Sequence, residues 1–301
     1  MKEKVLMLWP VKEDYWPRKL AELNLVDIDN TYNKLSFVGN IIKKICVLNG
    51  LFISKFAGEW KKTLEKYDVI IVQASDITQH LPSWIRKKGY KGRIIYWYWD
   101  PVEGSVSPNK IDRSACEIWS FDKTDCKVFD MQYNSTYYIP VDKDDKKHIS
   151  DKNYDICYIG RDKGRLKELR VLERRYKKIG LKTYFYIVAT KPYYLNAKKL
   201  KKPIDYEKVI EIVRHSKAIL DINQDGQIGL SLRCMESLFE NKKLITNNKG
   251  IYKENFYNDS NFFVLKNLED DIYDFINKES EDLSDYREYY SFKNWLARFK
   301  M

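Results

Sequence analysis

The sequence predicts an α/β protein with two domains, each built on a parallel β-sheet with helices packed around it. Short apolar runs end in polar or turn residues and alternate with helical patterns, which is typical of sheets that bind ligands at the carboxyl ends of their strands. The alternation occurs twice, before and after a charged segment at 140–153 that we interpret as a linker. At 301 residues, 44% of them hydrophobic, the chain is long enough for two cores. We therefore expect two Rossmann-like domains that face each other across a cleft.

The first domain is expected at residues 1–145. Helical patterns fall at about 34–66 and 80–88. Between and around them, apolar runs predict strands at residues 5–9, 69–73, 94–99, 117–121 and 137–140.

The helix expected at 34–66 has apolar residues at helical spacing, and this pattern allows two interpretations. The simpler one is an amphipathic helix whose apolar face packs on the domain core, with Lys43 and Lys44 turned away. The alternative is a helix that faces a membrane. The apolar residues concerned are Leu35, Val38, Ile42, Ile45, Leu48 and Phe52.

The second domain is expected at residues 153–285 and repeats the architecture of the first without visible internal sequence identity. Residues 286–301 predict a final helix with aromatic and basic faces. Helical patterns lie at about 164–179, 205–216 and 231–241, and strands are expected at 155–160, 183–188, 218–222, 243–246 and 262–265.

Composition limits the compartment and the partners. The formal charge of +11 indicates an anionic partner, such as phosphates, acidic lipid headgroups or nucleic acid, although a bias toward lysine explains it equally well. Five cysteines without a C-x-x-C pair indicate reduced thiols in a cytoplasmic protein. No run approaches the ~18 uncharged apolar residues of a membrane span, and the first ten residues predict a strand rather than a signal peptide.

The most informative segment is Gly229-Leu230-Ser231, followed by a helix that carries Arg233 and Glu236. A tight turn of small residues presents free backbone N–H groups at a helix N-terminus, where an anion can bind. Arg233 and Glu236 are three residues apart and so lie on one face of the helix. A cation for phosphate beside a carboxylate for hydroxyl groups is what a nucleotide-sugar pocket needs.

A second candidate phosphate site follows the first strand of the second domain. Gly160 permits close approach of the backbone, Arg161 can contact two phosphate oxygens, and Lys163 adds a point charge. The same pattern also fits a solvated basic loop. Between the two sites, Asp225 and Gln227 offer hydrogen bonds to sugar hydroxyls, in a turn whose composition is also that of an ordinary surface connection.

The second half of the chain resembles the nucleotide-sugar-binding domain of GT-B glycosyltransferases, especially the bacterial type that builds surface polysaccharides. Tyr-Ile-Gly-Arg-Asp-Lys-Gly is similar to the phosphate loop of that family, and Gly-Leu-Ser-Leu-Arg-Cys-Met-Glu-Ser-Leu is similar to its Gly-x-x-x-Arg-x-x-Glu-x-Leu segment. The match covers about residues 155–250. The resemblance implies that Glu236 binds the ribose and that the donor diphosphate is held by Gly160, Arg161, Lys163, Gly229, Leu230, Ser231 and Arg233.

The sequence departs from the family at the donor sugar. Many relatives carry two glutamates with seven residues between them, and here the earlier position is Ile228. Recognition of the hexose must therefore differ, through Asp225 or Gln227. The spacing of Arg161 and Lys163 is also closer than in many relatives.

The resemblance implies that the first domain binds the acceptor. An inverting reaction needs a base to deprotonate the acceptor hydroxyl, whereas a retaining one might need none. The candidates are Asp14, Asp76 with His80, and Asp100, each after a predicted strand. Asp100 is favoured because the aromatic residues before it would shield a site and stack on sugars, although Asp100-Pro101 also fits a simple strand end.

The sequence thus predicts a glycosyltransferase that moves a sugar from a nucleotide diphosphate sugar to a carbohydrate or lipid-linked glycan acceptor in surface polysaccharide synthesis. UDP is the nucleotide that family frequency favours, and neither a cofactor nor a metal is expected. We expect a cytoplasmic protein in peripheral contact with the inner face of the membrane. The C-terminal helix either supports that contact or, as the resemblance implies, packs back on the first domain.

Two rival functions fit parts of the sequence. One is a non-catalytic, basic double-Rossmann module that binds nucleic acid or another polyanion, although no nucleic-acid-binding motif is present. The other is a metal-dependent GT-A transferase that would use Asp27 and Asp29, which are expected in a loop before a helix. The three histidines have no metal-ligand spacing.

Overall fold

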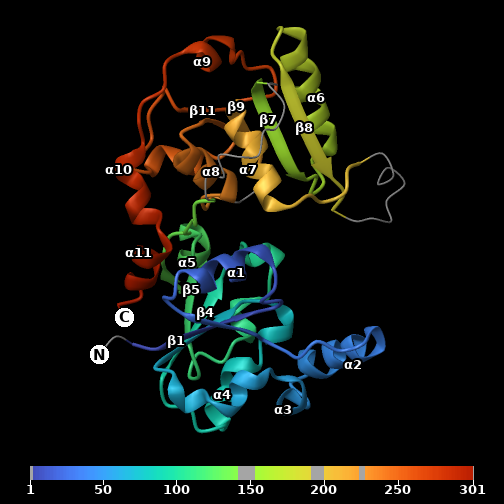
Figure 1. The fold of residues 1–301 in the computed structure, drawn as a ribbon, viewed down its shortest axis with the longest axis vertical. Helices are drawn as coiled ribbons and strands as arrows, with labels where there is room; N and C mark the ends of the chain where they lie inside the picture. Colours follow the sequence, from blue (N-terminus) through green and yellow to red (C-terminus); the bar gives the residue numbers. More distant parts are fainter. Residues whose placement is uncertain (1–2, 142–152, 191–199, 224–227, 301) are drawn as a thin grey trace. The chain divides into compact units, whose positions relative to one another are not determined.

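The computed structural model describes residues 3–141, 153–190, 200–223 and 228–300 (Figure 1). The chain divides into two compact units, which are Met1–Ile139 with Lys293–Met301, and Pro140–Phe292. Most of the linker expected at 140–153 lies outside the described residues. None of the described helices has the length and apolar character needed to cross a membrane.

The first unit contains a six-stranded sheet in the order β2-β1-β3-β4-β5-β6, in which every neighbouring pair is parallel. Its central strands are buried, which explains their nearly continuous apolar runs. The strands are β1 (Val5–Trp9), β2 (Asp27–Asn30), β3 (Val69–Gln73), β4 (Arg93–Tyr98), β5 (Glu117–Ser120) and β6 (Gln132–Tyr133).

The helices of the first unit include one from the far end of the chain. In the segment that begins with this last helix, Trp295 and Phe299 are fully buried. Their rings lie 5.2 and 6.0 Å from the ring of Trp97 on β4. The helices are α1 (Tyr15–Glu22), α2 (Phe37–Leu48), α3 (Ile53–Phe56), α4 (Leu81–Lys87), α5 (Lys123–Phe129) and α11 (Phe292–Ala297).

The second unit contains a five-stranded parallel sheet in the order β11-β10-β9-β7-β8. Its strands are β7 (Tyr154–Arg161), β8 (Thr183–Val188), β9 (Ser216–Asp221), β10 (Lys243–Thr246) and β11 (Phe262–Val264). Its helices are α6 (Leu166–Lys178), α7 (Tyr206–Arg214), α8 (Leu232–Glu240), α9 (Tyr273–Asn277) and α10 (Ser284–Arg287). The prediction of an α/β protein with two parallel sheets is therefore confirmed.

Several local expectations were wrong. In the run at 137–140, Tyr137, Tyr138 and Ile139 are buried, but the run forms only an isolated bridge at Tyr138 and no strand. Conversely, the polar segment Asp27–Asn30 is the edge strand β2, not a loop. The helix expected at 34–66 ends at Leu48, and the one expected at 286–301 is divided, because Ser291 is extended before α11.

The core-facing interpretation of the 34–66 helix was also wrong. In α2 the side chain of Val47 is buried, while Val38, Ile42 and Ile45 are exposed. Lys43, expected to point away, donates its ammonium to the carbonyl of Asn33 at 3.0 Å. The pattern correctly predicted an amphipathic helix, but its apolar side faces away from the unit.

Candidate functional site

Polar residues gather at the carboxyl edge of the second sheet, where each strand ends in a loop. The loops after β9 and β10 are tied together, because the backbone N–H of Asn223 donates to the Asn247 side chain at 2.7 Å. The Asn247 amide returns a bond to the carbonyl of Asn223 at 3.3 Å. Such an edge is where open α/β sheets bind their ligands.

The turn after β7 is fixed by the buried carboxylate of Asp162. This carboxylate accepts bonds from the Thr190 N–H (2.7 Å), the Thr190 hydroxyl (2.9 Å) and the Gly164 N–H (3.3 Å). Burial alone would raise the pKa of Asp162, but these hydrogen bonds lower it overall. Lys163 and Gly164 have positive φ angles of 42° and 85°, which the turn requires. The turn therefore presents the side chains of Arg161 and Lys163 to solvent.

The start of α8 is fixed in a similar way. The hydroxyl of Ser231 caps the helix by accepting from the Cys234 N–H at 3.2 Å, and it donates to Asp221 at the end of β9 at 2.7 Å. The side-chain amide of Asn248 donates to the carbonyls of Ile228 (3.0 Å) and Gly229 (3.2 Å). The loop that leads into α8 is thus held from both neighbouring strands.

Arg233 lies inside this edge rather than on its surface. Its guanidinium is 3.4 Å from the Asp221 carboxylate, donates to the carbonyl of Ile159 at 2.9 Å, and stacks over the ring of Tyr158 at 4.9 Å. A β-carbon on Gly160 would lie 1.9 Å from its terminal nitrogen. Gly160 therefore provides the space in which Arg233 joins α8 to β7.

The sequence did not identify several residues near the edge, among them Arg165, Tyr206 and Asp221. Arg165, the third cation of the turn after β7, is half-buried, and burial lowers its pKa. The hydroxyl of Tyr206 donates to Glu236 at 2.9 Å. Arg165 had a visible signal, because it follows Arg161 and Lys163 in the same turn, whereas Tyr206 is thirty residues from its partner.

Glu236 is only 4% exposed. Burial raises its pKa to about 7, against the smaller opposing effects of the Arg233 charge and the Tyr206 hydrogen bond. Asp225 and Gln227, the candidates for the donor sugar, lie outside the described residues.

In the first unit, the candidate bases follow adjacent strands but do not form a shared site. Asp76 and Asp100 are exposed, and within the described parts of the chain no bond joins Asp76 to His80. The His80 ring is instead 3.2 Å from the carbonyl of Leu48 at the end of α2. Of the three aromatic residues before Asp100, Tyr98 is buried in the core and Trp97 packs on Trp295. Trp99 is partly exposed and packs against Trp9 and Tyr137.

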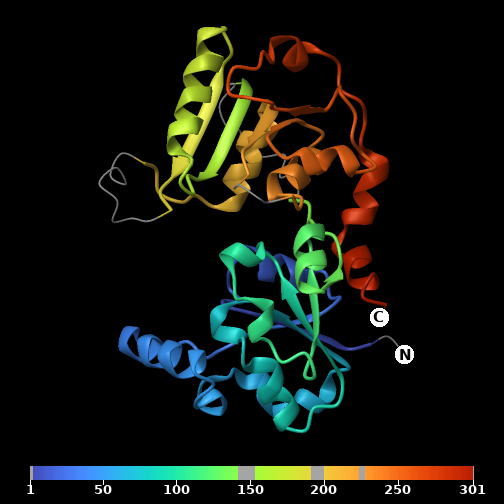
Figure 2. The ribbon, with the colours of Figure 1, turned by 180° about the vertical axis from the view of Figure 1, so that it is seen from behind.

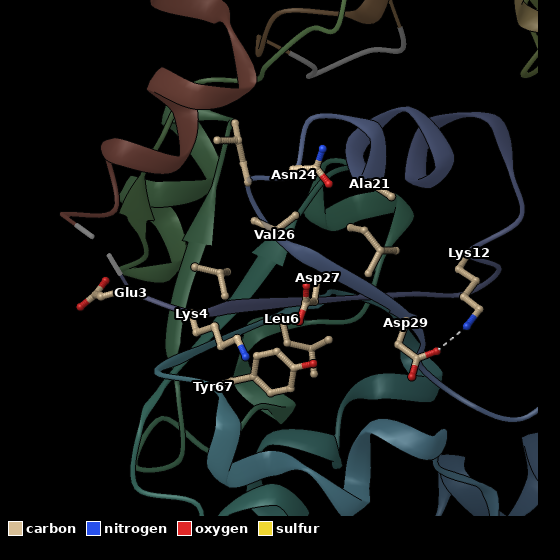
Figure 3. Close-up of a pocket in the computed structure, with 13 residues that line it drawn as sticks. Glu3, Lys4, Leu6, Lys12, Ala21, Asn24, Val26, Asp27, Asp29 and Tyr67 are labelled. Carbon is tan, nitrogen blue, oxygen red and sulfur yellow. Dashed lines mark hydrogen bonds and ion pairs between the residues drawn. The ribbon is translucent and has the colours of Figure 1, made fainter. Parts of the chain in front are cut away.

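Asp27 and Asp29 line a pocket of about 590 Å³ along the edge strand β2 (Figure 3). The ammonium of Lys12 lies 3.1 Å from the Asp29 carboxylate. Burial, followed by a hydrogen bond with Asp27, raises the pKa of Tyr67 to about 12. Among the described residues, no group of three or more acidic, histidine or cysteine side chains is arranged to hold a metal.

Comparison with known proteins identifies the fold. No protein-family model matches the sequence, and no curated protein matches it significantly. Sucrose-phosphate synthase from Thermosynechococcus elongatus matches with a TM-score of 0.56 at 9% identity, over 99% of this chain and 97% of that one. HepE of Anabaena, solved with UDP, gives 0.53 at 9% identity over 99% and 98%. A putative UDP-N-acetylglucosamine 2-epimerase from Listeria monocytogenes gives 0.51 at 10% identity over 99% and 91%.

At these identities the likeness shows the fold alone. The chain has the GT-B fold, which the resemblance of its second half predicted.

Proposed function

We propose that this protein is a glycosyltransferase that takes a sugar from a nucleotide diphosphate sugar, with UDP as the nucleotide. The observation that carries the proposal is the cationic turn beside a capped helix N-terminus at the carboxyl edge of the second sheet. Arg161 and Lys163 are exposed there, and the first turn of α8 adds the positive end of its dipole. The shared fold with HepE, which was solved with UDP, supports the choice of nucleotide.

Each residue has a role in this proposal. When the bond between the sugar and the diphosphate breaks, negative charge develops on the leaving nucleotide. Arg161, Lys163 and the N–H groups of 229–231 neutralise it. Glu236 binds the ribose hydroxyls, and Asp225 or Gln227 contacts the sugar. Arg233 acts on the diphosphate through its charge and by holding β7 against α8.

The acceptor belongs to the first unit in this proposal. It is a carbohydrate or lipid-linked glycan of surface polysaccharide synthesis, reached at the inner face of the membrane by a cytoplasmic protein. If the reaction inverts the anomeric configuration, Asp100 is the proposed base, with Asp76 or His80 as the alternatives.

Thermal-shift titrations with UDP, GDP, CMP and ADP, with and without EDTA, test the donor site. We expect UDP to raise the melting temperature selectively and without metal, because a ligand that binds only the folded state stabilises it. Arg161→Ala should remove the shift and abolish transfer while the protein stays folded. Lys167→Ala, an exposed cation on α6 of the same unit, is the matched control and should keep both.

Three results would contradict the proposal. Polyanion binding that weakens steeply with salt, without any nucleotide shift, would favour the binding module. A strict requirement for Mn²⁺ together with loss of activity in Asp29→Asn would favour the metal-dependent transferase. Conversion of UDP-N-acetylglucosamine into its 2-epimer, without any acceptor, would favour an epimerase, an activity named for one protein of the same fold.

A further inference from the structure

Helix α2 and the residues beside it expose a concentrated apolar surface, and both views show this helix extending from the rest of the first unit (Figures 1 and 2). Phe37 is 82% exposed, Phe52 68% and Val38 63%. Eight of the 17 large hydrophobic side chains that are exposed in the described parts of the chain lie between 35 and 52. We call these eight the α2 surface: Leu35, Phe37, Val38, Ile41, Ile42, Ile45, Leu51 and Phe52.

Local hydrogen bonds fix this surface. The Ser36 hydroxyl caps the start of α2 by accepting from the Gly39 N–H at 3.2 Å. At the other end, the N–H groups of Gly50 and Leu51 donate to the carbonyls of Val47 (3.1 Å) and Cys46 (2.9 Å), the pattern of a Schellman motif. Gly50 has a φ of 70°, as this motif requires. Helix α2 therefore has hydrogen-bonded caps at both ends, and its apolar side chains are exposed on a regular helix and not in an irregular loop.

The charged side chains of the segment that forms the α2 surface have one sign. Between Asp29 and Glu59 the sequence contains four lysines and no acidic residue. The ammonium of Lys43 is bound inward to a backbone carbonyl, and Lys34, Lys44 and Lys55 are exposed. An apolar face with a basic border fits an anionic surface that has an apolar interior.

We propose that the α2 surface docks on an anionic lipid bilayer, with α2 lying in the plane of the headgroups. Twelve residues of helix span only about 18 Å, far less than the ~30 Å of a bilayer core, so α2 lies on the membrane and does not cross it. A second copy of the chain fits this surface poorly, because two copies of a segment with four lysines and no carboxylate repel each other. The proposal assigns the membrane contact of the proposed function to named residues, and it is independent of the donor site because no residue of the second unit enters it.

Sedimentation of the full chain with lipid vesicles tests the proposal. We expect binding to phosphatidylcholine vesicles that contain about 30% phosphatidylglycerol, and at least tenfold weaker binding to phosphatidylcholine alone. The double substitution Phe37→Ser with Ile41→Ser should lower the affinity for anionic vesicles at least about tenfold, since it removes two apolar contacts. Val128→Ser, which replaces a similarly exposed side chain on α5, is the matched control and should have no effect.

A second pair of variants separates local charge from the net charge of the chain. Lys44→Glu with Lys55→Glu should weaken binding about tenfold or more, whereas Lys167→Glu with Lys278→Glu changes the net charge equally in the second unit and should not. Equal losses in both pairs would overturn the proposal, because binding would then follow net charge alone. Unchanged vesicle binding in the Phe37→Ser, Ile41→Ser variant would also overturn the proposal. A third contradicting result would be a wild-type chain that is a dimer in the absence of lipid and becomes a monomer when these two residues are substituted. The UDP-induced thermal shift should be the same in every variant, which separates failure here from failure of the donor site.

Discussion

At the scale of single residues, Glu236 shows how burial sets the chemistry of a side chain. It lies on α8 and accepts a hydrogen bond from the Tyr206 hydroxyl, and burial raises its pKa to about 7. A carboxyl group with this pKa changes its charge near neutral pH. If it accepts the ribose hydroxyls as a carboxylate, UDP should bind more tightly as pH rises from 6 to 8.

Glu236→Gln should change how stability depends on pH. The folded state holds the proton up to about pH 7, whereas an unfolded glutamate releases it near 4.5. The contribution of Glu236 to the free energy of unfolding of the wild type is therefore fully present below pH 4.5, and it is lost as pH rises toward 7. Glutamine does not titrate, so its free energy of unfolding does not fall in this way. Relative to wild type, the free energy of unfolding of the variant should therefore rise by on the order of 3 kcal/mol between pH 4.5 and 8.

Urea unfolding at several pH values measures this difference. Tyr206→Phe is the companion variant. It removes a hydrogen bond that lowers the pKa of Glu236, so this pKa should rise and the loss of stability should continue to higher pH than in wild type. A constant difference between wild type and Glu236→Gln across this range would show that the buried carboxyl group does not titrate near neutral pH.

The residues that the sequence identified and those it missed differ in one physical respect. Arg161, Lys163 and Ser231 stand next to strand ends or helix starts, and their positions follow from local pattern alone. Tyr206 and Asp221 act through contacts that only the folded chain creates. The inward position of Arg233 was not predictable either, because it depends on the space that Gly160 leaves across the sheet edge.

At the scale of elements, the junction of β7 and α8 depends on one glycine. Gly160→Ala would place a methyl group 1.9 Å from the Arg233 guanidinium, which would have to leave the Ile159 carbonyl and the Asp221 carboxylate. We expect a loss of about 1–2 kcal/mol in the free energy of unfolding, since the guanidinium, 20% exposed, can shift toward solvent but would lose its hydrogen-bond partners. Gly104→Ala, where a β-carbon meets open space and φ is not positive, should be nearly neutral.

Chemical denaturation of both variants checks this prediction, and the UDP-induced thermal shift should fall in Gly160→Ala as the junction moves. Equal stability of Gly160→Ala and Gly104→Ala would mean that Arg233 can leave its position at no cost, and the junction would then not depend on this contact.

Elements were predicted most reliably where the sequence pattern and the burial agree. Val69–Gln73 and Lys243–Thr246 are buried strands, and their apolar runs set their limits. The pattern failed for α2, because periodicity shows that a helix has an apolar face but not whether that face meets the core. It also missed β2, since an edge strand can be as polar as a loop.

At the scale of the whole molecule, the chain returns to the first unit after it has completed the second. Lys293–Met301 belongs to the first unit, where Trp295 and Phe299 pack against Trp97. All eight tryptophans of the chain lie in the residues of this unit. Intrinsic tryptophan fluorescence therefore reports the unfolding of the first unit alone, whereas circular dichroism reports both.

Trp295→Ala should destabilise the first unit selectively. Removing this fully buried ring should cost about 3–5 kcal/mol, because the packing with Trp97 and Phe299 is lost and a cavity remains. The urea concentration at the midpoint of the fluorescence transition should fall. The unfolding transition of the second unit, followed by circular dichroism, should keep its wild-type midpoint. Tyr273→Ala, a half-exposed aromatic residue of the second unit, should leave the fluorescence midpoint unchanged. If both probes fall together in Trp295→Ala, the two units unfold as one cooperative body, and the last nine residues stabilise the whole chain rather than one unit.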